Sequence, residues 1–150
     1  PLRLPFGRQY VVPNGLLISV LGGSFESEYP QPANKTTSNG TTTLTPTTPS
    51  GDNTWLVMRV DVRHRLRDDS LQSPARSEFT LTVNGQEQSP NQAIAPDPYE
   101  SQTLSPRMVI RDSFVYSVPS GTTADDVSMS WETALPDGDL KAIWSSSPSG

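Results

Sequence analysis

A chain of 150 residues is long enough to form one domain with its own core, but 15 prolines and only 33% hydrophobic residues make it poorly suited to helices. The absence of cysteine excludes disulfides, thiolate nucleophiles and cysteine-based metal sites. The net charge of -5, with only two lysines, disfavours nucleic acid as a partner, because phosphate binding needs clustered Lys and Arg.

The first predicted hairpin turns at Asn14-Gly15, a pair typical of tight turns between strands, and branched apolar side chains flank it on both sides. Pro13 has no amide hydrogen to donate to a neighbouring strand, so we expect it at a strand end or at a sheet edge. Gly22-Gly23 predicts a bulge or a bend in the second strand of this hairpin.

A tract rich in Ser, Thr, Asn, Pro and Gly follows, at residues 30–54. It contains a single leucine and cannot offset the entropy of ordering, so we expect a long mobile surface loop. Asn34 and Asn39 each begin the acceptor pattern for N-glycosylation and are the candidate glycosylation sites. The alternative is a plain flexible loop. The composition also resembles the O-glycosylated stalks of surface proteins.

The sequence WLVMRVDVRH, residues 55–64, gives the clearest strand prediction. Apolar side chains occupy every second position from 56 to 62, and charged ones occupy 59, 61 and 63, which is typical of a half-buried strand. Trp55 falls on the polar parity. We therefore expect Trp55 to be the one exposed tryptophan, which could stack on a sugar, whereas Trp131 falls on a buried parity.

The same alternation predicts further strands at residues 79–83, 114–118 and 127–131, and a short last strand at 140–144. Asn84-Gly85 predicts a tight turn after the first of these strands. Two stretches are expected to be irregular connections, residues 65–77 and 90–106. Seven or eight short strands without a helix predict an all-β, immunoglobulin-like antiparallel sandwich that forms a single domain over residues 1–150.

The single histidine, His64, lies between Arg63 and Arg65, and cationic neighbours disfavour the protonated form through which a general base must pass. We therefore expect a structural or surface histidine. Arg63, Arg65 and Arg67 could form an anion-binding patch. The interleaved acidic residues favour local ion pairs instead; these are Asp61, Asp68 and Asp69.

The acidic residues suggest two alternative functions, calcium binding and glycoside hydrolysis. Asp125-Asp126 and Asp137-Gly138-Asp139 could bind Ca²⁺, although neither has EF-hand spacing and Asp-Gly is common in turns. Two acidic pairs could serve a glycosidase, but spacing along the chain does not give the separation of their carboxyl groups. These pairs are Glu26 with Glu28, and Asp112 with Glu132. No metal site and no cofactor are expected.

The chain presents a Gly-Leu strand after a turn, a long insertion, WLVMRVDVRH, FTLTVNGQE and then FVYSVPSGTTADDVSMSW. This order, including the Phe-x-x-x-Val-Pro segment at residues 114–119, resembles the telokin-like immunoglobulin-like domains of prokaryotic lipoproteins and secreted proteins. That group is similar to the mycobacterial immunoprotective secreted antigen. The resemblance spans most of residues 13–144 and implies a sandwich outside the membrane, often with an N-terminal lipid anchor, and no catalytic residues. The long Thr-rich insertion departs from the family.

The composition, with nine Arg against two Lys and ten Asp against six Glu, also resembles that of proteins from salt-loving archaea. The alternative explanation of this composition is a GC-rich genome. No apolar run approaches the length of a membrane span, and a signal or anchor could precede Pro1. We expect a non-enzymatic extracellular or cell-surface module that binds a protein or a glycan, or that spaces another domain from the surface. The alternative is a carbohydrate-active or other hydrolase domain that uses loop carboxylates.

Overall fold

The computed structural model describes the chain except for residues 39, 50, 67–68, 91–97, 137 and 148–150; for residues 29–38 and 41–47 it describes the backbone. The described residues form thirteen β-strands and two short 3-10 helices, without an α-helix. No helix in this part of the chain is long and apolar enough to cross a membrane. The all-β prediction is therefore confirmed.

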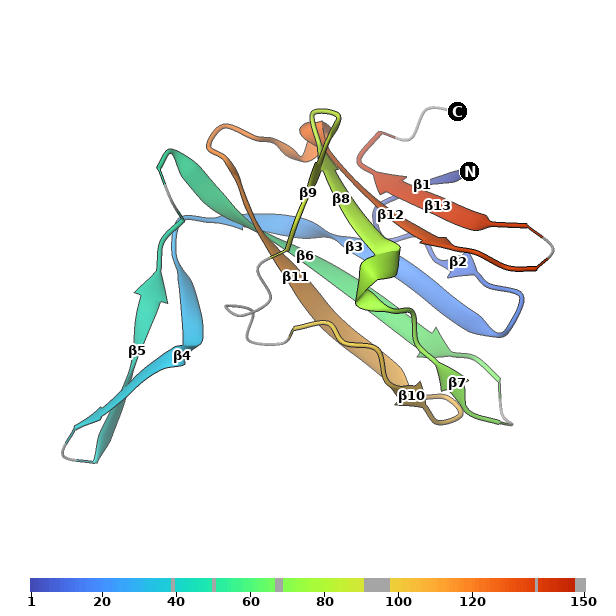
Figure 1. Cartoon of the computed structure of the whole chain (residues 1–150), viewed down its shortest axis with the longest axis horizontal. Helices are drawn as coiled ribbons and strands as arrows, with labels where there is room; N and C mark the ends of the chain where they lie inside the picture. The colour runs from blue at the N-terminus through green and yellow to red at the C-terminus, as the bar shows by residue number, and fades with distance from the viewer. Residues whose placement is uncertain (39, 50, 67–68, 91–97, 137, 148–150) are drawn as a thin grey trace.

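Two sheets make up most of the structure (Figure 1). The first has the order β1 (Leu2–Pro5), β13 (Leu140–Ser145), β12 (Val127–Thr133), β8 (Phe79–Val83) and β9 (Gln86–Gln88). The second has the order β11 (Val109–Pro119), β6 (Asn53–His64), β3 (Leu16–Glu26) and β2 (Tyr10–Val11). Neighbouring strands are antiparallel except for β1 and β13, which are parallel.

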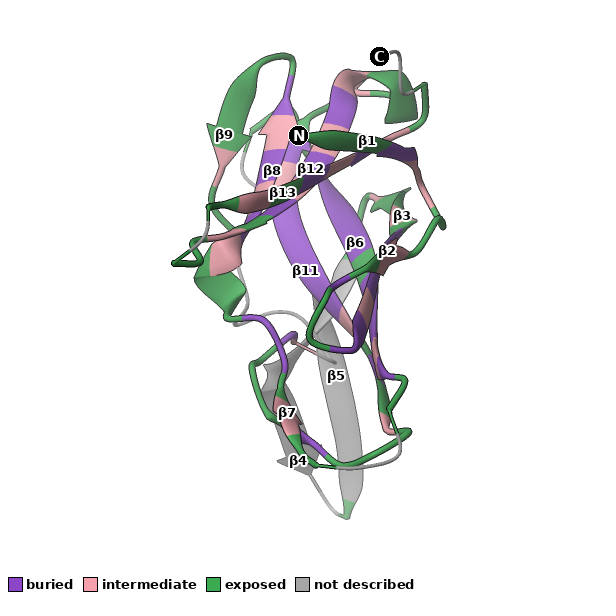
Figure 2. Cartoon of the chain, turned by 90° about the vertical axis from the view of Figure 1, so that its right-hand side faces the viewer, coloured by how far each residue is buried: buried purple, intermediate pink, exposed green. Residues whose placement is uncertain are grey.

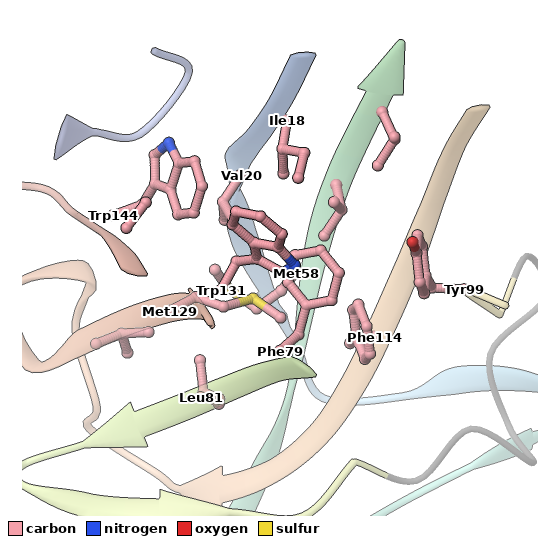
Figure 3. Packing of buried hydrophobic residues seen from close by; sticks show 14 of the residues in the cluster. Ile18, Val20, Met58, Phe79, Leu81, Tyr99, Phe114, Met129, Trp131 and Trp144 are labelled. Carbon is pink, nitrogen blue, oxygen red and sulfur yellow. The ribbon is translucent and has the colours of Figure 1, made fainter. Parts of the chain in front are cut away.

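The sheets face each other across one apolar core, so the chain is a β-sandwich. Buried residues concentrate on β6, β8, β11 and β12 (Figure 2), and the inward side chains of both sheets meet in a single cluster (Figure 3). Leu56, Met58, Val60 and Val62 of β6 are all buried, as their alternation predicted. The opposite parity of β6 is also buried at Trp55, Val57 and Asp61, so β6 is buried on more than the one face that the alternation predicted.

Two smaller ribbons and the 3-10 helices complete the described structure. β7 (Leu71–Gln72) pairs with β10 (Thr103–Leu104), and β4 (Tyr29–Ser38) pairs with β5 (Thr41–Thr47). The helices are η1 (Arg76–Glu78) before β8 and η3 (Ala124–Asp126) before β12. The strands β1, β7 and β10 were not predicted, because two to four residues carry no readable periodicity and depend on their partners.

The prediction of a loop at residues 30–54 is wrong for most of its length, because β4 and β5 occupy it, while the expected mobility stays a prediction. The β4–β5 pair forms a hairpin that projects away from the sandwich (Figure 1). This tract can bury little apolar surface, but Thr has a high strand propensity and a hairpin supplies backbone hydrogen bonds within itself.

The prediction that Trp55 is exposed is also wrong, since only 4% of its surface is accessible. Its parity does turn it away from the main core. On that outer face, however, it packs with Val57 and Val115 in a second, small apolar cluster. Val115 is contributed by β11, so the cover for this face comes from a strand about sixty positions further along the chain.

The predicted turns and the bulge are confirmed. Asn84 and Gly85 both have positive φ, and the Asn14 side chain accepts a hydrogen bond from the Leu16 amide at 3.1 Å in the first turn. The pairing register of β3 with β6 shifts by one residue between Val20 and Gly22, which is the predicted bulge. The φ of Gly22 is 111°, a value that glycine adopts readily.

Replacing Gly23 by alanine is expected to lower the free energy of unfolding by about 1–3 kcal/mol, measured by urea denaturation, because the new methyl group overpacks the core edge. A Cβ there would lie 2.6 Å from the Met58 sulfur, 2.8 Å from Leu56 Cδ1 and 3.0 Å from the Val57 carbonyl oxygen. Ser24→Ala, at the next and exposed position, is the control and should change little. Equal effects of the two substitutions would contradict the steric explanation.

Candidate functional site

A cavity of about 620 Å³ opens between the β2–β3 turn, the segment from β7 to η1, and the strands β12 and β13. Its apolar lining includes Leu16, Trp131 and Leu140, and the exposed Leu135 lies at its rim. The volume lies within the range of small-molecule sites, which are typically apolar pockets with a few polar groups. This cavity is the candidate binding site.

Hydrogen bonds fix the polar wall of the cavity. The Ser73 hydroxyl oxygen accepts from the Gln102 amide at 2.8 Å, while the Ser101 hydroxyl donates to the Ser73 carbonyl at 2.8 Å. Gln72 Nε2 donates to Ser101 Oγ at 2.6 Å. These bonds, together with the β7–β10 pairing, hold two chain segments about thirty residues apart in one preformed wall.

Tyr99 supports the same wall from inside the core. Its hydroxyl donates to the Pro74 carbonyl oxygen at 2.7 Å, and its ring stacks on Phe114 with centroids 5.2 Å apart (Figure 3). Burial raises the pKa of the Tyr99 phenol, and burial likewise raises the pKa of the Tyr116 phenol on β11. Both side chains are therefore held as neutral phenols.

Glu78 is the single charged residue among the described residues that line the cavity. Its Oε1 accepts a hydrogen bond from the Ala75 amide at 2.8 Å, which fixes the carboxylate at the start of η1. No Lys or Arg lies among the described residues of this lining. The electrostatics therefore favour uncharged or cationic ligands over anionic ones.

Trp131 combines two features at this site. It is 3% exposed and forms part of the wall, and its ring lies against Tyr10 with centroids 5.8 Å apart. Its indole N–H is buried and has no hydrogen-bond partner among the described residues. An unpaired buried donor costs about 1–3 kcal/mol, and this cost is carried by a residue of the cavity wall. The alternation correctly predicted that Trp131 is buried, but nothing in the sequence marked it as a cavity residue.

His64 lies outside the cavity, at the end of β6, and is buried. Its Nδ1 accepts from the Leu66 amide at 3.2 Å, and its Nε2 lies 3.1 Å from the Asp69 carbonyl oxygen, to which it donates. A neutral ring satisfies both bonds. Of the two expected roles, structural or surface histidine, this geometry fits the structural one.

The predicted ion pairing is confirmed for Arg63, whose Nε lies 2.8 Å from Asp61 Oδ1. Arg111 Nε lies 2.7 Å from the other oxygen of Asp61, a pair that was not predicted because fifty residues separate the two. Arg67 and Asp68 lie outside the described residues.

The acidic clusters hold the backbone or pair locally. Asp126 Oδ2 accepts from the Thr123 amide at 2.9 Å, Asp125 Oδ1 accepts from the Ser146 hydroxyl at 2.6 Å, and Glu132 pairs with Lys141 at 3.3 Å. The described residues contain no group of three or more side chains that could hold a metal ion. Asp137 lies outside them.

Four further acidic residues named above are not among the described residues that line the cavity: Glu26, Glu28, Asp112 and Asp139. Glu26 has one buried carboxylate oxygen without a partner among the described residues, and Glu28 is exposed. Asn34 lies in β4, where the backbone is described, and Asn39 lies outside the described residues. Their modification stays a prediction.

The sequence matches no protein-family model and no curated protein. The fold is similar to the yjhA protein of Bacillus subtilis, with a TM-score of 0.61 and 14% identity over 93% of this chain and 98% of that one. It is also similar to an uncharacterized β-sandwich protein of Clostridium difficile, with a TM-score of 0.54 and 13% identity over 97% and 94% of the two chains.

A third similar structure is ycdA of Bacillus subtilis, described as a candidate lipoprotein, with a TM-score of 0.56 and 12% identity. The match covers 95% of this chain but 39% of ycdA, so this chain spans about two fifths of that protein. At these identities the likenesses show the fold alone. The chain is thus an all-β sandwich of a kind found in bacterial proteins of unknown function.

Proposed function

We propose that this chain is a non-enzymatic, immunoglobulin-like module of the cell surface or the extracellular space that binds the uncharged, largely apolar part of a ligand. The observation that carries the proposal is the preformed cavity with Trp131 in its wall. A rigid, mostly apolar pocket with few polar groups is the usual form of a binding site for a small molecule or for a projecting group of a larger partner.

The strand order supports the immunoglobulin-like part of the proposal. In that fold one sheet contains strands A, B and E, and the other contains G, F and C. Here β3, β6 and β11 take the places of A, B and E, while β13, β12, β8 and β9 take those of G, F, C and C′. On the far side of β11, where an antiparallel strand D would lie, the described residues contribute a single isolated bridge, which is parallel, between Pro98 and Ser113.

The site chemistry supports binding over hydrolysis. Among the described residues, the lining contains the single carboxylate of Glu78, which already accepts a bond from the Ala75 amide. Glycoside hydrolysis ordinarily needs two carboxyl groups that flank the bond to be cleaved. The similarity to a candidate lipoprotein supports the surface location.

The test is a fluorescence titration with N-phenyl-1-naphthylamine, an uncharged apolar probe whose emission rises in apolar sites. The wild-type chain is expected to bind it saturably at a single site. Ser77→Phe places a large ring on an exposed position of the lining and should weaken binding at least about tenfold, since it removes most of the buried contact area.

Ser120→Phe is the matched control, because it adds the same ring at an exposed position outside the lining. It should leave the affinity unchanged. Non-saturable binding by the wild type, or an equal effect of both substitutions, would show that the cavity is not a binding site. Thermal unfolding of both variants verifies that each remains folded.

A further inference from the structure

The outer face of the second sheet carries a group of arginines that the cavity does not use. Alternation along β6 places Arg63 and Asp61 on this face, and β11 adds Arg111 beside them. The segment between β1 and β2 adds Arg8. These four side chains line a shallow depression of about 430 Å³, next to the edge strand β2.

A buried carboxylate holds two of the guanidinium groups in place. Asp61 is 2% exposed, and its two oxygens accept from Arg63 Nε at 2.8 Å and from Arg111 Nε at 2.7 Å. Arg63 Nη2 also reaches Asp61 Oδ2, at 3.3 Å. The buried Asp61 carboxylate holds both arginine side chains in place in the folded chain. Their conformational entropy is therefore largely lost on folding, and ligand binding does not have to restrict them again.

Donors remain after Asp61 is satisfied. Within the described part of the chain, Nη1 of Arg63 and both Nη atoms of Arg111 have no acceptor, and the Arg8 side chain forms no ion pair. The Arg111 side chain is 65% exposed and that of Arg63 is 38% exposed. Guanidinium groups with free Nη donors match the oxygen atoms of phosphate and sulfate groups.

The local charge favours an anion despite the Asp61 carboxylate. Three guanidinium groups and one carboxylate line the depression, so it carries a net charge of +2. The whole chain carries -5, and the depression is therefore an exception to the composition of the protein. It is also compact, unlike the extended basic track that follows a nucleic acid backbone.

We propose that this depression binds an oxyanion, a phosphate or sulfate group, through Arg8, Arg63 and Arg111, with Asp61 positioning the last two. The inference goes beyond the apolar ligand proposed for the cavity and does not depend on it. Val11 lines the depression and its neighbour Val12 lines the cavity, so β2 separates the two sites.

The test is an NMR titration of the ¹⁵N-labelled chain with inorganic phosphate and, separately, with inorganic sulfate, at constant ionic strength. Saturable shifts are expected for the backbone amides of Arg8, Ser19, Arg63 and Arg111. Arg111→Gln should weaken binding about tenfold, because it removes a charged hydrogen-bond donor from the site. Arg3→Gln removes the same charge from an exposed position of β1 and should have no effect.

Linear, non-saturable shifts, or equal losses in Arg111→Gln and Arg3→Gln, would overturn the proposal, since they indicate general electrostatics. A third titration uses vesicles of equal parts phosphatidylglycerol and phosphatidylcholine. Binding to them that Arg111→Gln abolishes identifies a lipid headgroup as a source of the oxyanion. Binding to vesicles alone, unaffected by Arg111→Gln, would also refute the site. The phosphate titration is independent of the apolar probe, so failure at one site leaves the other testable.

Discussion

Replacing Trp144 by alanine is expected to lower the free energy of unfolding by about 3–5 kcal/mol, as measured by urea denaturation. Trp144 lies on β13 and is completely buried among the inward side chains of both sheets (Figure 3). Its indole N–H also donates to the Arg8 carbonyl oxygen at 2.7 Å. Truncation would leave both a cavity and an unpaired backbone carbonyl, and these two costs add.

This hydrogen bond joins residues 136 positions apart and ties the segment between β1 and β2 to the last strand. Trp144→Phe keeps most of the ring and removes the N–H, so its smaller loss, about 1–2 kcal/mol, estimates the bond together with the missing ring atoms. Leu135→Ala, at an exposed position, should change stability by less than about 0.5 kcal/mol. A Trp144→Ala loss no larger than that of Leu135→Ala would show that the core does not depend on this ring.

The parts of the fold that could be predicted are those in which neighbouring residues carry the signal. β6 was readable because its inward side chains, at every second position from 56 to 62, are all apolar. The turns at Asn14-Gly15 and Asn84-Gly85 were readable because positive φ restricts the residue types within four positions. In both cases the cause and its sequence pattern occupy the same short segment.

The candidate sites could not be predicted, because each depends on residues that only the fold brings together. The cavity joins the turn at Leu16 to Ser73 and to Trp131, and none of the three has a sequence neighbour that indicates the others. Asp61 was correctly expected to pair with a nearby arginine, but its second partner, Arg111, comes from another strand. The same holds for Trp55, whose apolar partner Val115 decides its burial.

The β4–β5 hairpin could not be predicted from the sequence for a different physical reason. Composition measures how much apolar surface a segment can bury, and by that measure the Thr-rich tract should stay unpaired. Backbone pairing between two β-branched segments close in sequence pays a small loop-closure entropy and needs no apolar face of its own. A prediction based on composition therefore fails where short-range pairing is available.

Alkaline pH is expected to destabilise the sandwich, because burial raises the pKa of both the Tyr99 and Tyr116 phenols. In the unfolded chain these phenols lose their protons near the ordinary pKa of about 10, whereas the folded chain retains them. The folded state then binds more protons, so the free energy of unfolding falls as pH rises above about 10. At pH 11 each phenol is expected to cost about 1.4 kcal/mol, and the pair about 3 kcal/mol, relative to pH 8.

The measurement is urea denaturation of the wild-type chain and of Tyr116→Phe at pH 8, 10 and 11. Phenylalanine keeps the ring and cannot ionise, so the variant should lose only about half as much stability over this range. Tyr99→Phe should reduce the pH dependence in the same way, but it also starts about 1 kcal/mol lower at pH 8 because the bond to the Pro74 carbonyl is gone. If Tyr116→Phe shows the same alkaline loss as the wild type, groups other than the buried phenols cause it. If the loss is halved, the phenol of β11 is held neutral in the core as its burial requires.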